Sequence, residues 1–455
     1  MHSGENMVRR STEGGAPHGP AGQQGQDSGS GVGYTAASNT RGDGANMERA
    51  AMQPVALAVD GGTPVRSTPL PMWPHFDEAD IEAVGQVLRS GRINYWTGEN
   101  CRAFEAAFAR HCATRHAIAL SNGTVALELA LQVLGVGAGD EVIVTSRSFM
   151  ASAAAPVLRG ARAVFADVDE DSQNVTAETI APQVTPRTRA IIVVHLAGWP
   201  CEMDEIMALA AAHGLKVIED CAQAHAALYR GKPVGSIGHV GVFSFCQDKI
   251  MTTGGEGGML VTNDDDLFDQ AWSLKEHGKS RRAIVETAEQ PGFKWLHESF
   301  GTNGRLTEMQ AVLGLRQLDI LERWHGRRTE NAIALLVALS GTPGLRLPTP
   351  PGHVEHAWYK FYGFVRPEQL RDGWDRDRVK HAINREGVPC WMGSCPEIYR
   401  EKAFAGTGME PAERFPVAAR LGETSLMFMV HPTLGPDEMN DTVVAVRKVL
   451  AAAVR

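Results

Sequence analysis

One stretch decides the fold, residues 217–264, which read VIEDCAQAHAALYRGKPVGSIGHVGVFSFCQDKIMTTGGEGGMLVTND. It contains two short apolar runs, at 241–245 and 258–262, and it begins inside a third run at 215–219. Short apolar runs that are bounded by turn residues are typical of strands buried within a sheet. The glycine-rich turn 254–258 leads directly into the last run and allows a tight return of the chain. We therefore predict three buried strands here.

Similar apolar runs precede this stretch, and helix-like segments such as 124–135 and 203–213 separate several of them. Alternation of strands and helices predicts an α/β fold with a mostly parallel sheet, here of seven strands. In such sheets ligands bind at the carboxyl ends of the strands, so the residues that follow each run are candidate site residues. The upstream runs lie at 117–120, 141–145, 163–167 and 190–195.

The remainder of the chain predicts a second, smaller domain. A long helical pattern covers about 305–339, and a break rich in Pro and Gly follows at 342–352. We predict a large domain over 51–340 and a smaller α+β domain over 341–455. Within the smaller domain, the pattern is strand-like at 358–365 and helical at 375–386 and 436–452.

The first 50 residues differ from the rest of the sequence. They hold 11 glycines and no Leu, Ile, Phe or Trp. Such a segment cannot bury enough apolar surface to offset the entropy lost on ordering. We predict that residues 1–50 form a disordered N-terminal extension, and Met47 and Met52 are later candidate start positions.

The composition is that of an ordinary globular protein and excludes several classes of function. The 455 residues suffice for two or three domains, with 43% hydrophobic and 21% charged residues. A net charge of −9 argues against a broadly basic protein that binds nucleic acid or an anionic membrane. No apolar run reaches the roughly 18 residues of a membrane span, and the N-terminus lacks the apolar stretch of a signal peptide. The seven cysteines form no C-x-x-C pair, so we predict no metal site and a cytoplasmic location.

Two polar features follow predicted strands. Residues 121–124, Ser-Asn-Gly-Thr, come after the first run and open a helix. A glycine turn at a helix N-terminus can bind an anion, although a plain capped helix start is the alternative. Asp220 ends the fifth run, where a carboxylate beside an apolar sheet needs a cationic or hydrogen-bonding partner. The alternative explanation for Asp220 is that its side chain caps the N-terminus of a helix.

A third feature, Lys249, follows the sixth run and precedes the glycine-rich turn. A partly desolvated lysine loses basicity and can become a nucleophile toward a carbonyl carbon. The string lacks the order G-x-x-x-x-G-K-[ST], which excludes a P-loop. Lys249, Asp220 and the 121–124 turn together predict one ligand, a planar aldehyde with a ring nitrogen and a phosphate. That ligand is pyridoxal phosphate.

At this point the chain resembles the DegT/DnrJ/EryC1/StrS family. Its members are sugar aminotransferases of the fold-type-I class of pyridoxal-phosphate enzymes, with a fold like that of aspartate aminotransferase. The resemblance runs from about Gly61 to the C-terminus, and residues 217–264 carry its most specific match in order and spacing. Two further motifs support it, SRSFMASAAA at 146–155 and FGTNGRLTEMQAVLGLRQL at 300–318.

The resemblance implies a role for each matched position. Lys249 would be the catalytic residue and form the imine with the cofactor, and Asp220 would pair with the pyridinium nitrogen. Asn303 would reach the phosphate of the neighbouring subunit, which implies a homodimer with composite active sites. The alternative for Asn303 is that it caps the following helix. The other implied cofactor contacts are Gln223 at the phenolic oxygen, Phe149 stacked on the ring, and Gly123, Thr124 and Ser244 at the phosphate.

Departures from the family pattern concern the substrate more than the cofactor. Cys246 stands where many members carry histidine, and HAWYKFYGFV at 356–365 has Tyr359 and Lys360 where relatives often carry histidine or another polar residue. Lys249 argues against the dehydratase branch, whose members have histidine at that position. The candidate substrate contacts are Arg305, Tyr359 and Lys360.

The expected reaction is transfer of an amino group from L-glutamate or L-glutamine to a keto sugar. We predict that this sugar is linked to a nucleotide. Such reactions serve polysaccharide or antibiotic biosynthesis. A keto cyclitol or another secondary-metabolite intermediate is the close alternative. A non-catalytic regulatory protein on the same scaffold is a third. The intact Lys249, Asp220 and Ser244 argue against it, because a scaffold without turnover need not keep all three.

Other polar positions have ordinary structural explanations. His195 ends the fourth run and either lines the site or is hydrogen-bonded in the core. Arg305 either binds an anionic substrate group or forms a structural pair. Cys221 and Cys246 are interpreted as packing residues. The arginine pairs at 281–282 and 327–328 are predicted to lie on solvated faces.

Overall fold

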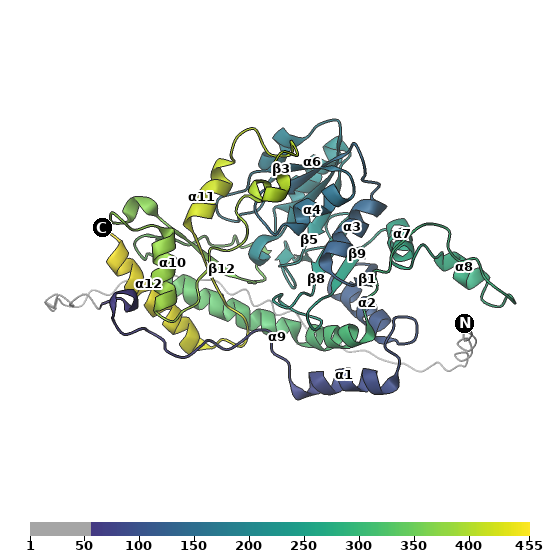
Figure 1. Ribbon diagram of the computed structural model, residues 1–455, viewed down its shortest axis with the longest axis horizontal. Helices are drawn as coiled ribbons and strands as arrows, with labels where there is room; N and C mark the ends of the chain where they lie inside the picture. Colours follow the sequence, from purple (N-terminus) through teal and green to yellow (C-terminus); the bar gives the residue numbers. More distant parts are fainter. Residues whose placement is uncertain (1–55) are drawn as a thin grey trace, which may run out of the picture. The chain divides into compact units, whose positions relative to one another are not determined.

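The computed structural model describes residues 56–455 (Figure 1). The predicted disordered extension, residues 1–50, lies outside the described residues. In the described part, no helix combines the length and the apolar character that a membrane span requires.

The central sheet has seven strands, and each coincides with one of the predicted runs. The strand order is β1-β9-β8-β5-β4-β2-β3. All neighbours are parallel except β9, which is antiparallel to β1 and β8. This confirms the predicted α/β fold with a mostly parallel sheet. The strands are β1 (His116–Leu120), β2 (Glu141–Thr145), β3 (Arg162–Ala166), β4 (Thr188–Val194), β5 (Lys216–Asp220), β8 (Val240–Ser244) and β9 (Gly258–Thr262).

Alternate side chains of the central strands point to opposite faces of the sheet and enter two separate hydrophobic clusters. Ile191 of β4 packs in the cluster that includes α2, α6 and α9, whereas Ile192 packs in the cluster that includes α3, α4 and α7. The sheet is therefore the middle of three layers. The helices are α2 (Asn100–His111), α3 (Gly123–Val133), α4 (Ala151–Leu158), α6 (Met203–His213), α7 (Asp265–Lys275) and α9 (Glu308–Leu339).

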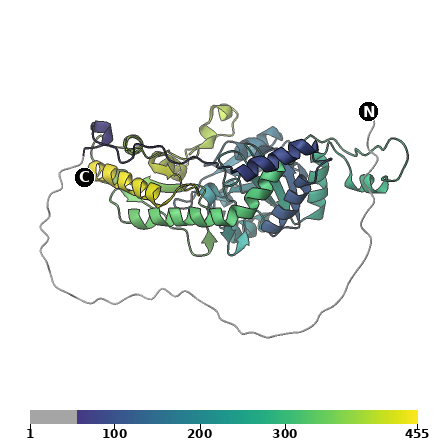
Figure 2. The same cartoon turned by 90° about the horizontal axis from the view of Figure 1, so that it is seen from below.

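Helix α9 links the central sheet to the C-terminal part of the chain (Figure 2). It runs for 32 residues, and Thr307 is its N-cap in a reciprocal capping box with Gln310. Ala311 near its start lies in a core cluster of the sheet, and Leu335 near its end lies in the core of the C-terminal part. Because Thr307 caps the helix, the alternative that Asn303 is the cap is wrong.

The C-terminal part has its own three-stranded sheet, in the order β10-β12-β13, packed with α10 and α12. These elements match the strand and the helices predicted after the Pro/Gly break. Leu57 joins the same core and Arg66 pairs with Glu438 of α12, so the start of the described chain lies on this part. The division into domains 51–340 and 341–455 stays a prediction. The bounds are β10 (Leu345–Arg346), β12 (Phe361–Val365), β13 (Ser425–Phe428), α10 (Arg376–Arg385) and α12 (Pro436–Ala453).

Several shorter elements surround these two parts. Helix α1 packs against α9, and α8 lies on an arm that extends away from the sheet beyond α7 (Figure 1). A third small sheet has the order β11-β6-β7. The bounds are α1 (Glu78–Ser90), α5 (Ala177–Ile180), α8 (Arg281–Glu286), α11 (Pro416–Thr424), β6 (Leu228–Tyr229), β7 (Lys232–Pro233) and β11 (Val354–Glu355).

The prediction that both arginines at 327–328 lie on a solvated face is wrong for one of them. Arg327 is exposed and pairs with Glu330, as predicted, but Arg328 is only 1% exposed. The guanidinium of Arg328 lies 5.1 Å from the ring centroid of Trp73, and burial lowers its pKa to about 9. The physical reason is helical periodicity, which places Arg328 on the same inward face as the buried Ala332 four residues later. Both members of the other pair, 281–282, are exposed as predicted.

Candidate active site

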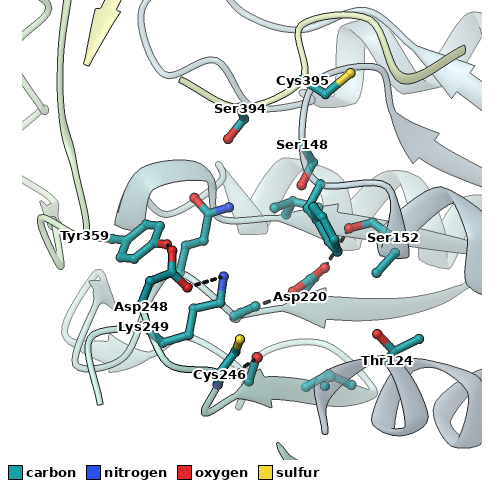
Figure 3. A pocket seen from close by; sticks show the side chains of 18 of the residues that line it. Thr124, Ser148, Ser152, Asp220, Cys246, Asp248, Lys249, Tyr359, Ser394 and Cys395 are labelled. Atoms are coloured by element: carbon teal, nitrogen blue, oxygen red, sulfur yellow. Dashed lines mark hydrogen bonds and ion pairs between the residues drawn. The ribbon is translucent and has the colours of Figure 1, made fainter. Parts of the chain in front are cut away.

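A cavity of about 1010 Å³ lies at the carboxyl ends of the central strands (Figure 3). Its walls include residues that directly follow β1, β5 and β8, which is where parallel sheets bind ligands. The C-terminal part supplies another wall through residues 359–362 and 391–395. All the predicted cofactor residues except Asn303 line this cavity, and their individual roles stay predictions. They are Gly123, Thr124, Phe149, Asp220, Gln223, Ser244 and Lys249.

Lys249 enters the cavity from the turn that follows β8 (Figure 3). The backbone there is held in place, because Trp73 Nε1 donates to the Lys249 carbonyl at 2.8 Å and the Lys249 amide donates to the Cys246 carbonyl at 3.1 Å. The amine lies 3.9 Å from Oδ1 of Asp248 and 5.2 Å from the ring centroid of Tyr359. With its side chain 16% exposed, Lys249 has the partly buried amine that a nucleophile toward a carbonyl requires.

Asp220 ends β5 with its carboxylate buried beside the cavity. Its Oδ2 accepts a hydrogen bond from Ser152 Oγ at 2.7 Å, and its Oδ1 accepts one from the Ala222 amide at 3.1 Å. Burial raises the pKa of Asp220, and these two hydrogen bonds only partly offset that effect. Among the described residues, no cation lies within 4.0 Å of this carboxylate. It therefore suits a ligand with a protonated ring nitrogen.

The start of α3 forms a cradle for an anion. Gly123 is its first residue, and the side chain of the N-cap Asn122 accepts from the Val125 amide. The N–H groups of a first helical turn have no partner within the helix and attract negative charge. A Cβ atom on Gly123 would lie 2.9 Å from the Ser244 Cβ, so only glycine lets the helix start come this close to β8. The amides of this turn, with the hydroxyls of Thr124 and Ser244, suit a phosphate.

Two more side chains complete the fit to a flat, phosphorylated ring. Gln223 is fixed beside the cavity because its Oε1 accepts from the Ala197 amide at 2.8 Å. Phe149 is 68% exposed where it lines the cavity, and an exposed aromatic face suits stacking on a ring. The site combines an anion cradle, a carboxylate without a cationic partner and a partly buried amine, and these are the groups that would hold pyridoxal phosphate.

Asn303 and Arg305 do not line this cavity. Asn303 is exposed, and its backbone forms a β-bridge with Glu276. The guanidinium of Arg305 pairs with the buried carboxylate of Glu276 at 2.8 Å. The structure thus places Arg305 in the structural pair that was its alternative explanation.

Tyr359 and Lys360 line the cavity from the C-terminal part, and their role as substrate contacts stays a prediction. Tyr359 is buried, and its hydroxyl donates to Oδ2 of Asp248. The Lys360 amine lies 4.7 Å from the ring centroid of Tyr359, and burial lowers the pKa of Lys360 to about 8. An amine of this kind still carries positive charge at neutral pH and can bind an anionic group of a substrate.

His195 belongs to the core and does not line the cavity. Its Nδ1 accepts from the Cys201 amide at 3.0 Å, and its Nε2 lies 3.2 Å from Oε2 of Glu219. The Glu219 carboxylate also accepts from three backbone amides, which satisfies it without a metal ion. Cys221 is a buried packing residue, whereas Cys246 lines the cavity and burial raises the pKa of its thiol.

Sequence reasoning missed several residues of the cavity. Ser152, which donates to Asp220, lies in the first turn of α4, within the same SRSFMASAAA motif that contains Phe149. Asp248 is adjacent to Lys249 in sequence, but its contact with Tyr359 joins positions 111 residues apart and gives no local signal. The wall opposite the cradle was also missed. It consists of Ser148, Trp391, Gly393, Ser394, Cys395, Met427 and Met429.

The Gly123→Ala variant tests the cradle. The added Cβ would meet Ser244 at 2.9 Å, so α3 must move away from β8. We expect the dissociation constant for pyridoxal phosphate to rise at least about tenfold while the fold is retained, because the phosphate loses aligned N–H donors. Gly137→Ala is the control, since a Cβ at Gly137 meets nothing within 4 Å. Equal cofactor affinity of the two variants, measured by absorbance titration, would contradict the cradle.

Comparisons with known proteins agree with this geometry. The DegT/DnrJ/EryC1/StrS aminotransferase family matches residues 74–447. The dTDP-3-amino-3,4,6-trideoxy-alpha-D-glucose transaminase of Streptomyces venezuelae is 36% identical over 366 residues, covering 80% of this chain and 90% of that protein. The L-glutamine:2-deoxy-scyllo-inosose aminotransferase of Streptoalloteichus tenebrarius is 35% identical over 422 residues, covering 87% of this chain and 98% of that protein. The crystal structure of an aminotransferase from Psychrobacter cryohalolentis matches at a TM-score of 0.83 with 54% identity, covering 84% of this chain and 99% of that one.

These matches confirm the predictions of a transaminase and of pyridoxal phosphate as its cofactor. They do not support the alternative of a regulatory scaffold without turnover. The match covers both the central sheet and the C-terminal part, so the whole described site lies within it. The chain belongs to the DegT/DnrJ/EryC1/StrS family of pyridoxal-phosphate-dependent aminotransferases.

Proposed function

We propose that this transaminase moves an amino group from L-glutamate or L-glutamine to the ketone of a nucleotide-activated sugar. The observation that carries the proposal is the extent of the cavity, which continues past Lys249 to a wall from the C-terminal part. Its volume of about 1010 Å³ is at the upper end for ligand sites and leaves room for a second ring beside the cofactor. The relative from Streptomyces venezuelae, named for a dTDP-amino-sugar, supports this class of acceptor.

The wall suits a ring that carries hydroxyl groups. Ser148 and Ser394 present hydroxyls on the side of the cavity away from Thr124 (Figure 3). Trp391 and Tyr362 add aromatic surface to the same wall. Hydroxyls fix orientation through hydrogen bonds, and aromatic faces cover the apolar C–H surface of a sugar ring.

Different residues of the chain would bind the cofactor and move the proton. Pyridoxal phosphate, when bound, supplies the electron sink. Asp220 keeps the proton on the ring nitrogen, and the cradle at Gly123 holds the phosphate. Lys249, once displaced by the donor amine, takes the proton from the donor α-carbon and returns it to the ligand. Water would supply the keto oxygen of the departing acid while the amino group stays with the cofactor. The same steps in reverse would aminate the acceptor and release water, which gives ping-pong kinetics.

A keto cyclitol is the second candidate acceptor, and one feature of the cavity favours it. Among the described residues that line the cavity, Lys249 and Lys360 are the cationic ones. A nucleotide diphosphate would need cations beyond these, whereas a free cyclitol would not. The relative from Streptoalloteichus tenebrarius, named for 2-deoxy-scyllo-inosose, supports this alternative.

A panel of acceptors distinguishes the two candidates. Purified holoenzyme would receive glutamate or glutamine with nucleotide-linked keto sugars on one side and 2-deoxy-scyllo-inosose on the other. We expect kcat/KM for at least one nucleotide sugar to exceed that for the cyclitol at least about 100-fold, because nucleotide contacts add binding energy in the transition state. The reverse ranking supports the cyclitol. Conversion of glutamate in a single turnover without amination of either class would overturn both acceptors.

We also propose that the enzyme is a cytoplasmic homodimer with composite active sites. Three large apolar side chains, Phe293, Trp295 and Phe300, are 76%, 83% and 98% exposed on the segment that leads to Asn303. Exposed apolar clusters of this kind mark protein interfaces, and the second copy of the chain is the occupant proposed here. The partner's phosphate would then be within reach of Asn303, whose amide donates without adding buried charge. All seven cysteines are unpaired, which fits the reducing cytoplasm.

Mixing of inactive variants tests the shared site. Asn303→Ala subunits and Lys249→Ala subunits would each form dimers with little activity. In a mixed dimer one site carries both changes and the other carries neither, so a 1:1 mixture should recover about a quarter of wild-type activity. No recovery although heterodimers form, or a fully active wild-type monomer in sedimentation, would contradict the composite site.

A further inference from the structure

A carboxylate beside Lys249 is held in place by a buried tyrosine. Asp248 Oδ1 lies 3.9 Å from the Lys249 amine, and its Oδ2 accepts from the Tyr359 hydroxyl (Figure 3). Tyr359 is 7% exposed, and its own amide donates to the Ala197 carbonyl at 2.9 Å. The tyrosine is therefore a rigid anchor for a carboxylate that is itself 59% exposed toward the cavity.

Among the described residues, Asp248 is the carboxylate that lies within 4.0 Å of this amine. Burial lowers the pKa of His225 to about 3 and raises the pKa values of Cys246 and Tyr359, so these three groups are neutral at pH 7. Asp220 forms no ion pair with this amine within 4.0 Å, and its carboxylate accepts from Ser152 Oγ and the Ala222 amide. The charged and titratable groups that face the Lys249 amine from the packed elements are Asp220, His225, Cys246, Asp248, Tyr359 and Lys360.

We propose that Asp248, anchored by Tyr359, is a positioning residue that sets both the location and the proton affinity of the Lys249 amine. The carboxylate attracts the protonated amine and holds it on the Tyr359 side of the cavity. Burial raises the pKa of Asp248, but the charge of Lys249, the hydrogen bond from the Tyr359 hydroxyl and the charge of Lys360 together keep it below the usual value. This role does not depend on the identity of the acceptor.

The consequence concerns the proton that Lys249 carries. As the base of the reaction, Lys249 would take the proton from the donor α-carbon and become an ammonium. The C–H bond breaks with its electron pair left on the ligand, and the same proton returns when the ammonium donates it. Asp248 stabilises the ammonium between these two transfers.

The Asp248→Asn variant of the holoenzyme tests this role directly. The visible absorbance of the bound cofactor changes with the proton on the Lys249 nitrogen. Removal of a negative charge about 4 Å away destabilises the protonated form, so the midpoint of this titration should fall by about one pH unit or more. The single-turnover rate with glutamate should fall about tenfold, while the glutamate concentration at half-saturation changes less than about twofold.

Three further variants separate this role from a structural one. Asp248→Glu keeps the negative charge, so the midpoint of its pH titration should lie close to that of the wild type. Tyr359→Phe removes only the anchor and should lower the midpoint by less than Asp248→Asn does. Glu256→Gln is the matched control, because Glu256 is another exposed carboxylate of the cavity whose contact is the Cys246 thiol at 3.8 Å.

The outcomes decide the proposal. An unchanged midpoint in Asp248→Asn with normal cofactor binding overturns it, as does an equal shift in Glu256→Gln. If Asp248→Asn binds no cofactor, Tyr359→Phe decides instead, and an unchanged midpoint there overturns the proposal. Failure of the proposed acceptors would leave this titration unaffected, so the two results are distinguishable.

Discussion

Asp220 lies at the end of a buried strand, with two hydrogen bonds to its carboxylate and no cation within 4.0 Å among the described residues. A buried carboxylate without an ionic partner is unfavourable, and its raised pKa reflects that. A ligand with a protonated ring nitrogen would supply the missing charge. We propose that the ring nitrogen of pyridoxal phosphate would balance this charge, with the Lys249 amine and the phosphate cradle lining the same cavity.

The sheet topology brings these groups together from distant parts of the sequence. Strands β5 and β8 are parallel neighbours, with Asp220 in register with Val242, so the residues that follow them meet at one edge. The absent side chain of Gly123 lets the start of α3 approach β8 closely. Lys249 then faces Asp220 across the space between them (Figure 3). The C-terminal part lines the other side of the cavity.

Much of this arrangement could be predicted from sequence, because it depends on local signals. Runs of Val and Ile located the seven strands, and the residues that follow them located Asp220 and Lys249. The rest depends on tertiary packing. Arg328 is buried because α9 turns that face toward the core, and the contact of Tyr359 with Asp248 requires the C-terminal part to be docked. The wall near Trp391 and Ser394 has no local signature, because its shape is set by the same docking.

Reduction of the native protein with borohydride, followed by peptide mass mapping, tests the central claim most directly. The account predicts that reduction bleaches the visible absorbance and leaves a stable pyridoxyl group on Lys249. Of the two lysines that line the cavity, Lys249 is the one whose charge lowers the pKa of Asp220. A pyridoxyl group on another lysine would contradict the account. So would the absence of any such group after incubation with excess pyridoxal phosphate.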